Sequence, residues 1–171
     1  MVLAYLVIIL LTIFIVTYTG YHLYTQFLPG APFYPTTQND IKTIFKFLKS
    51  KPNDTFIDLG SGDGRIVIAA AQHGIKSIGY ELNPILIRQS QQQIKKLKLT
   101  KLAKIEPKNF WKANFNQADI ICIYQYPRYI KKLEKTFQKI NHPITVITND
   151  YPFPNKKPYL VKGKIYFYKF P

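Results

Sequence analysis

The chain opens with an apolar stretch that contains no charged side chain, residues 2–19. Eighteen residues in a helix span about 27 Å, close to the thickness of the hydrocarbon layer of a bilayer. Tyr18, Tyr21 and Tyr24 then match an interfacial aromatic belt. No basic segment precedes the stretch and no A-x-A-like cleavage site follows it, as a signal peptide would require. The stretch is apolar on every face, which disfavours a core helix. We therefore expect a retained transmembrane anchor over residues 1–27.

A segment rich in proline and glycine, residues 26–37, follows the anchor and predicts an extended linker. After it, Asn39 or Asp40 is predicted to cap a helix with apolar residues on one side. The expected organisation is an anchor over residues 1–27, a linker and loop over residues 28–40, and a single domain over residues 41–171.

Short apolar runs alternate with amphipathic segments through the rest of the chain. Such alternation predicts an α/β fold with a mostly parallel, twisted sheet and helices on both faces. Gly163 lies between two apolar runs and predicts a closing antiparallel hairpin. Strands are expected at residues 55–59, 77–82, 103–106, 119–126 and 144–148, and helices at residues 65–72, 84–97 and from Pro127 onwards.

The turn after the first predicted strand reads GSGDG, residues 60–64. In a parallel sheet, the ligand binds beyond the carboxyl ends of the strands, which is where this turn falls. Arg65 stands where the dinucleotide fingerprint needs its last glycine, and no P-loop is present. Glycine at positions 60 and 62 allows close approach of a ligand to the backbone, but this spacing alone is weak support for any ligand.

Acidic residues around this turn narrow the choice of ligand. Asp58 and Asp63 flank the turn, and Glu81 ends the second predicted strand. Asp58 and Asp63 would repel a pyrophosphate in a cleft of low dielectric. S-adenosylmethionine (SAM) carries a sulfonium, an ammonium and a ribose diol, so it suits these acids, with Glu81 accepting the ribose hydroxyls. The alternative for Asp63 is a helix N-cap, and for Asp58 a solvated strand end.

Charge is distributed unevenly. The net charge is +15, and no Asp, Glu, Lys or Arg occurs before Asp40. A basic domain attracts nucleic acid, acidic proteins or anionic headgroups, although general solubility explains the lysines equally well. Because these lysines all follow the anchor, the positive-inside bias favours a single-pass protein with its domain in the cytoplasm. Cys122 lies in an apolar run and is expected in the core.

Several short segments resemble one known family. The likeness extends from residue 30 to about residue 154, and the apolar segment before it adds to it. The segments are GAPFYPTT, IDLGSGDGRIVIAAA, GYELNP, NFW and YQYP, in this order. This order resembles the class I SAM-dependent protein lysine methyltransferases of the FAM173 type, which include membrane-anchored mitochondrial enzymes that modify inner-membrane proteins. The resemblance implies a Rossmann-like class I methyltransferase fold, SAM as cofactor and a protein lysine as methyl acceptor.

The resemblance also implies site residues. Asn109 stands where relatives often carry aspartate, and its amide oxygen can still accept a hydrogen bond from the adenine amino group. Phe110 and Trp111 either stack on the adenine or belong to the core. The expected cofactor-binding residues are Pro35, Thr36, Asp58, Gly60, Ser61, Gly62, Glu81, Leu82, Asn109, Phe110 and Tyr124, and the expected catalytic residues are Tyr34, Tyr124 and Gln125.

Three functions follow as hypotheses. The first is a membrane-anchored methyltransferase that transfers a methyl group from SAM to a lysine of a protein, one associated with the membrane. The second is a nucleic-acid methyltransferase, disfavoured because YQYP stands where many such enzymes carry an N-P-P-Y-type motif. The third is a non-catalytic SAM-binding membrane protein. No metal site is expected, since the three histidines are scattered.

Overall fold

The computed structural model describes residues 2–26 and 33–171, which belong to two compact units divided after Pro32. In the first unit, α1 (Val2–Gln26) is a single helix that extends beyond the predicted apolar stretch. Its segment Val2–Tyr21 is long and apolar enough to cross a bilayer, and none of it is buried. Residues 27–32, half of the linker predicted over residues 26–37, lie outside the described residues.

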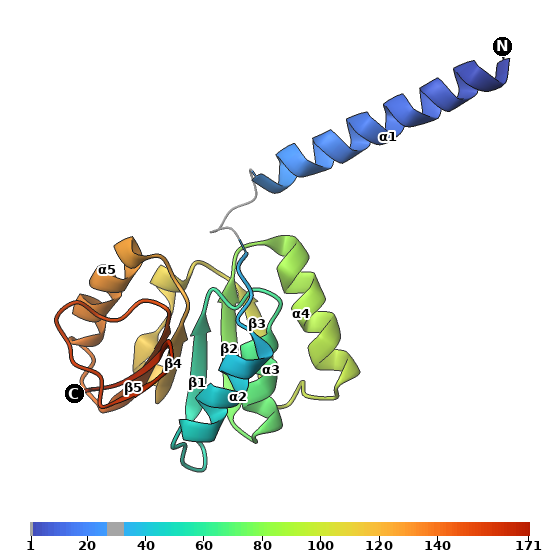
Figure 1. Cartoon of the computed structure of the whole chain (residues 1–171). Helices are drawn as coiled ribbons and strands as arrows, with labels where there is room; N and C mark the ends of the chain where they lie inside the picture. Colours follow the sequence, from blue (N-terminus) through green and yellow to red (C-terminus); the bar gives the residue numbers. More distant parts are fainter. Residues whose placement is uncertain (1, 27–32) are drawn as a thin grey trace. The chain divides into compact units, whose positions relative to one another are not determined.

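The second unit is built on one sheet of seven strands in the order β3-β2-β1-β4-β5-β7-β6 (Figure 1). The first five strands are parallel, and β7 joins them antiparallel to β5. Gly163, with φ of +60°, makes the tight turn of the predicted closing hairpin between β6 and β7. The strands are β1 (Thr55–Leu59), β2 (Lys76–Glu81), β3 (Ala103–Pro107), β4 (Ile120–Ile123), β5 (Ile144–Asn149), β6 (Leu160–Lys162) and β7 (Ile165–Phe170).

Helices cover both faces of the sheet, as predicted. Successive residues of a strand point to opposite faces, so each buried strand contributes side chains to a core on either side. One face packs Phe56 and Cys122 against α2 and α3, and the next residues, Ile57 and Ile123, belong to the core on the α5 face. α4 packs beside α3 over β2 and β3. The helices are α2 (Gln38–Phe47), α3 (Arg65–Gln72), α4 (Pro84–Lys96) and α5 (Pro127–Phe137), with short 3-10 turns at Phe110–Lys112 and Phe115–Gln117.

The start of α2 corrects one prediction. The cap is Thr37, not Asn39 or Asp40, and the helix begins at Gln38 within the segment expected to be linker. The Thr37 hydroxyl oxygen accepts from the Asp40 backbone N–H at 3.1 Å, and the hydroxyl donates to the Asp40 carboxylate at 2.7 Å. In the sequence, Asp40 has the character of a capping residue. It is instead the acidic residue that pairs with the capping hydroxyl of Thr37, three residues before it.

The strand order creates the place where a ligand binds in such folds. The chain runs outward from β1 to β3 and then returns to the other side of β1 as β4. Connections therefore leave the sheet in opposite directions at the carboxyl ends of β1 and β4, which opens a crevice there. Leu59 and Ile123 are register partners at these two ends. The glycine turn and Tyr124 thus emerge side by side.

Candidate functional site

Backbone hydrogen bonds fasten the glycine turn to the end of β2. The N–H groups of Gly60 and Ser61 both donate to the Tyr80 carbonyl, at 2.9 and 3.0 Å. Gly62 donates to Glu81 Oε2 at 2.8 Å. Gly60 and Gly62 have φ of +85° and +56°, a region that other residues adopt at a cost. These hydrogen bonds and the glycine dihedrals together set the shape of the turn.

Glu81 is held by backbone donors on two sides. Its Oε1 accepts from the N–H groups of Leu82 and Asn83 at 2.7 and 2.8 Å, while its Oε2 accepts from Gly62. A carboxylate offers about four lone-pair positions, so at least one remains for a ribose hydroxyl. Leu82, predicted to bind the cofactor, acts here through its backbone and is half-buried.

Asp58 is a buried carboxyl with only 4% of its surface exposed. Burial, followed by the charges of Glu81 and Asp63, raises the pKa of Asp58 to about 8. The expected alternative, a solvated strand end, is therefore wrong. A buried carboxylate is stabilised by a nearby cation, and a sulfonium with an ammonium supplies that charge where a pyrophosphate would oppose it. The residues present thus fit SAM.

Asp63 is not the N-cap of α3, which corrects that alternative: the N-cap is Gly64, and Asp63, one residue earlier, accepts through Oδ1 from the Arg65 N–H at 3.3 Å. The Asp63 carboxylate pairs with Arg65, whose Nη2 lies 2.6 Å from Oδ2. Arg65 Nη1 also donates to the Thr36 carbonyl at 2.9 Å. Arg65 therefore ties the segment before α2 to the glycine turn, a role that the sequence reasoning missed.

Side chains fill the space beside the glycines. A Cβ at Gly60 would collide with the Gln125 amide, and one at Gly62 would lie 2.5 Å from the Phe33 ring. The buried Gln125 donates through Nε2 to the Leu59 carbonyl at 3.0 Å, so it binds the residue that directly precedes the glycine turn. The predicted steering of a substrate by Gln125 and the predicted contacts of Gly60 and Gly62 with methionine remain predictions.

Ser61 turns its side chain toward the sheet. A Cβ added to Gly79 in β2 would lie 2.5 Å from Ser61 Oγ, so the turn fits only because Gly79 is glycine. Ser61 Oγ is buried and has no hydrogen-bond partner among the described residues. Its predicted contact with SAM stays a prediction.

The segment before α2 crosses toward the crevice. The Tyr34 ring stands edge-on to Tyr124, with 6.0 Å between ring centres. Pro35 is exposed, whereas Thr36 is buried and accepts the Arg65 hydrogen bond. The structure thus brings the predicted catalytic residues Tyr34 and Tyr124 together.

Tyr124 emerges from β4 and donates its hydroxyl proton to Asp150 Oδ2. Burial and this hydrogen bond raise the pKa of Tyr124, so the hydroxyl stays protonated. Asp150, directly after β5 with φ of +65°, was not foreseen from the sequence. Asp150 belongs to no motif in the sequence. Only the fold, which places β5 beside β4, shows that it lies next to Tyr124.

Asn109 and Phe110 follow β3 at the far side of the crevice. Asn109 Oδ1 accepts from the Trp111 N–H at 3.0 Å, which caps the first 3-10 turn. Phe110 and Trp111 are half-buried, and both contact the ring of Tyr129. The core alternative for these two rings is therefore at least partly correct, and adenine binding by Asn109 and Phe110 remains a prediction.

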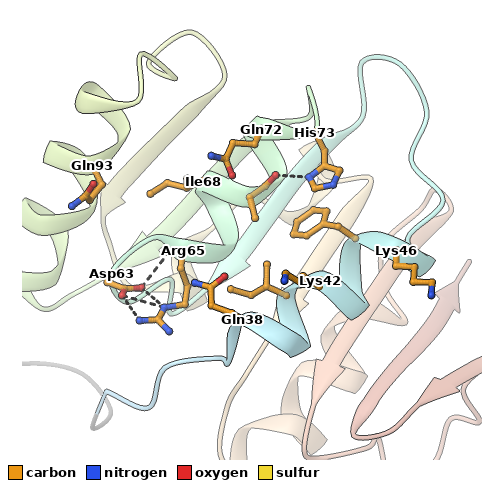
Figure 2. A pocket seen from close by; sticks show the side chains of 12 residues that line it. Gln38, Lys42, Lys46, Asp63, Arg65, Ile68, Gln72, His73 and Gln93 are labelled. Carbon is orange, nitrogen blue, oxygen red and sulfur yellow. Dashed lines mark hydrogen bonds and ion pairs between the residues drawn. The ribbon is translucent and has the colours of Figure 1, made fainter.

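A groove of about 640 Å³ lies elsewhere, between α2, α3 and α4 (Figure 2). Polar side chains such as Lys42, Lys46 and Gln72 line it, and His73 stacks on Phe45 with ring centres 4.7 Å apart. Asp63 and its partner Arg65 line one end of this groove, but none of the expected cofactor-binding or catalytic residues does. The expected cofactor-binding and catalytic residues lie mainly at the carboxyl ends of the parallel strands instead.

The comparison with known families decides the identity of this fold. Residues 58–160, which begin at Asp58 and include the glycine turn, Glu81 and Tyr124, match the ANTKMT methyltransferase domain. The chain belongs to this methyltransferase family. The resemblance to FAM173-type enzymes is thereby confirmed.

Two relatives and one solved structure are similar to this chain over most of its length. A human lysine N-methyltransferase named for a subunit of ATP synthase is 36% identical over 134 residues, 78% of this chain and 57% of that protein. A protein-lysine N-methyltransferase of Saccharolobus islandicus (strain REY15A) is 28% identical over 126 residues, 72% of this chain and 78% of that protein. This chain spans 51% to 59% of the lengths of the human enzyme and its counterparts from Xenopus laevis, mouse and rat.

The solved structure is an RNA methyltransferase from Salinibacter ruber in complex with S-adenosyl-L-homocysteine. It is 25% identical, with a TM-score of 0.72, and the match covers 80% of this chain and 92% of that one. The fold is that of a Rossmann-like methyltransferase, and SAM is the cofactor that this fold and family imply.

Proposed function

We propose that this protein transfers a methyl group from SAM to a lysine side chain of a protein substrate. Bound SAM would supply an electrophilic methyl group on a sulfonium. Its cation would lie near Asp58 and its ribose at Glu81, and its adenine would lie toward Asn109. The observation that carries the proposal is the grouping of Asp58, Glu81 and the glycine turn at the crevice in a chain of this family.

The residues around the methyl position act by positioning. A neutral lysine amine would accept the methyl group in line with its bond to sulfur, and SAM would be left as an uncharged thioether. The methylated amine then loses a proton to solvent. Tyr34 and Tyr124, which contact each other edge to face, would lie beside the approach, where an aromatic face attracts an ammonium and tolerates added methyl groups. Restricting the approach in this way favours in-line geometry and removes water.

Lysine is the acceptor that the relatives support best. Both relatives described above are named as lysine N-methyltransferases. An RNA substrate is the second candidate, favoured by the net charge of +15 and by the Salinibacter ruber structure. The sequence YQYP after β4 argues against RNA, because many nucleic-acid methyltransferases carry an N-P-P-Y-type motif there.

Membrane attachment completes the proposal. The apolar helix Val2–Tyr21 supports a single-pass anchor, and the lysines after it favour a cytoplasmic domain. We propose that the predicted organisation stands as an anchor over residues 1–27, a connecting segment and a catalytic domain. A membrane-associated protein is then the substrate that the domain meets most often.

The test uses SAM labelled in its methyl group. The purified full chain is incubated with membrane and soluble extracts, and the products are hydrolysed for amino-acid and nucleoside analysis. Label in methyl-lysine, enriched in the membrane extract, is the expected result. Label in nucleosides instead would replace the lysine proposal by the RNA candidate.

A further inference from the structure

Two carboxylates and one ammonium meet beside Tyr124. The Nζ of Lys164, which begins the return from the β6–β7 turn, lies 3.3 Å from Asp150 Oδ1 and 3.4 Å from Asp40 Oδ2. Its distance to the centre of the Tyr124 ring is 5.9 Å. With Lys164 counted, the cluster carries one net negative charge and is walled by an aromatic ring.

The two carboxylates are held firmly. Asp40 has 12% of its side chain exposed, and its Oδ2 accepts from the Thr37 hydroxyl. Its place in the first turn of α2 also stabilises its charge. Asp150 accepts from the Tyr124 hydroxyl, and its backbone N–H donates to the Lys164 carbonyl at 3.0 Å. Both acids thus keep their positions whether or not an ammonium lies between them.

The Lys164 ammonium is held loosely by comparison. Its contacts of 3.3 and 3.4 Å exceed the roughly 2.7–2.9 Å of strong charge-assisted hydrogen bonds. Its side chain is 41% exposed at the edge of the sheet. Although burial opposes it, the neighbouring Asp150 and Asp40 raise the pKa of Lys164. The two carboxylates therefore favour a lysine ammonium at this position, but they bind that of Lys164 weakly enough for another ammonium to displace it.

The cluster lies next to the expected methyl position. Ile123 is the register partner of both Leu59 in β1 and Thr148 in β5. Tyr124 is therefore flanked by the glycine turn on one side and by the segment leading to Asp150 on the other. Strands in a sheet are about 4.8 Å apart, so an ammonium held at Asp150 lies about one strand away from the crevice.

We propose that Asp40 and Asp150 form the receptor that captures the ammonium of the substrate lysine, and that Lys164 occupies this receptor until the substrate displaces it. This inference rests on the proposed lysine methylation and names its acceptor-binding residues. Capture concerns the charged lysine and affects KM. The amine loses its proton to solvent before it attacks. The expected SAM-binding residues do not include Asp40 or Asp150, so SAM affinity is independent of the receptor.

The first test is a nuclear magnetic resonance titration of the full chain in detergent micelles with nitrogen-15-labelled lysine. The Lys164 ammonium signal is identified by its loss in Lys164→Arg. Added n-butylammonium, which mimics the end of a lysine, is expected to shift this signal saturably. The shift is expected to vanish in Asp150→Asn. An equal shift with sodium chloride, or no saturation in the wild-type chain, would overturn the receptor.

The second test measures methyl transfer to poly-L-lysine. Lys164→Met is expected to lower KM several-fold, because the internal competitor is gone. Asp150→Asn is expected to raise KM roughly tenfold, the lower end for a charged hydrogen bond. SAM affinity stays within about twofold in both. Lys162→Met, in the same hairpin but over the Phe47 ring, is the matched control.

Equal KM values for Lys164→Met and Lys162→Met would refute the displacement. A wild-type chain that binds SAM but methylates no lysine would refute the proposed function, while the butylammonium titration would still decide the receptor separately.

Discussion

At the scale of single residues, the site depends on a carboxyl group that destabilises the fold when it is ionised. Asp58 is buried beside Glu81 and Asp63, and its pKa is raised to about 8. An unfolded chain ionises the same group near its ordinary value of 3.8. Folding therefore takes up a proton between these two values, and the folded state loses stability as the pH rises through this range. A cationic ligand removes this cost.

Replacing Asp58 by Asn is expected to stabilise the protein. The gain in melting temperature over the wild-type chain should be near zero at pH 4 and largest at pH 8 and above, where the ionised carboxylate costs most. Thermal unfolding monitored by circular dichroism across this range measures it. A variant that is less stable than the wild-type chain at pH 8 would show that Asp58 has a stabilising partner in the folded state.

Glu81 is expected to contribute directly to SAM affinity. Glu81→Gln keeps the size of the side chain but removes the charge behind its hydrogen bonds, each worth about 1.5–3 kcal/mol. SAM should bind roughly tenfold more weakly or worse by calorimetry. Glu106→Gln, at the end of the neighbouring strand, is the control and should bind normally. Equal affinities in the two variants would place the ribose elsewhere.

Sequence reasoning at this scale works for residues within a motif and fails for residues that only the fold assembles. Glu81 is predictable because its distance from the glycine turn follows from one crossover in the chain. Asp40, Asp150 and Lys164 come from three elements distant in sequence and meet only after the sheet has formed. Arg65 stands out in the sequence only as a missing glycine, although its side chain joins Thr36 to Asp63.

At the scale of elements, apolar periodicity together with Gly, Pro and capping residues predicts the strands and helices closely. β1 and α3 begin and end where the sequence predicts, and α4 begins at the predicted residue, with Asn83 capping it through Oδ1. The predicted start of α2 is wrong because Thr37 and Asp40 both have capping side chains, and only the backbone geometry separates them. The contact between Ser61 and Gly79 is also hidden in the sequence, since it joins a turn to the middle of a strand.

Gly79→Ala tests that contact. The added Cβ would lie 2.5 Å from Ser61 Oγ and 2.7 Å from Ile105 Cδ1. Overpacking of this kind costs about 1–3 kcal/mol and should displace the glycine turn. We expect a lower melting temperature together with weaker SAM binding. Gly74→Ala, with φ of +77° and open space around it, should lose stability and keep SAM affinity. Equal SAM affinity in both variants would contradict this account of the turn.

At the scale of the whole molecule, charge and hydrophobicity are separated along the chain. The apolar helix α1 carries no charged side chain, and the net charge of +15 lies entirely after residue 39. Attachment to a bilayer raises the effective concentration of an enzyme near a membrane substrate without any new contact. Lysines near anionic headgroups add about 1 kcal/mol each.

A variant lacking residues 1–27 should therefore bind SAM with unchanged affinity and methylate membrane substrates poorly in cells. It should recover activity on detergent-solubilised substrate at high concentration. Comparison of methyl-lysine in membranes from cells that express either form measures the effect. Full activity of the shortened chain in cells would make the segment dispensable, and failure to fold would make it part of the core.

The most direct measurement of the central claim is calorimetry of SAM binding at pH 7 in two buffers of different ionisation enthalpy. Asp58 is mostly protonated in the free protein at this pH, and the SAM cation should drive its ionisation. We predict release of most of one proton in the wild-type chain, little or none in Asp58→Asn, and weaker binding of NADH than of SAM. SAM binding without proton release in the wild-type chain, or tighter binding of NADH, would contradict the assignment of this turn to an adenosyl cation.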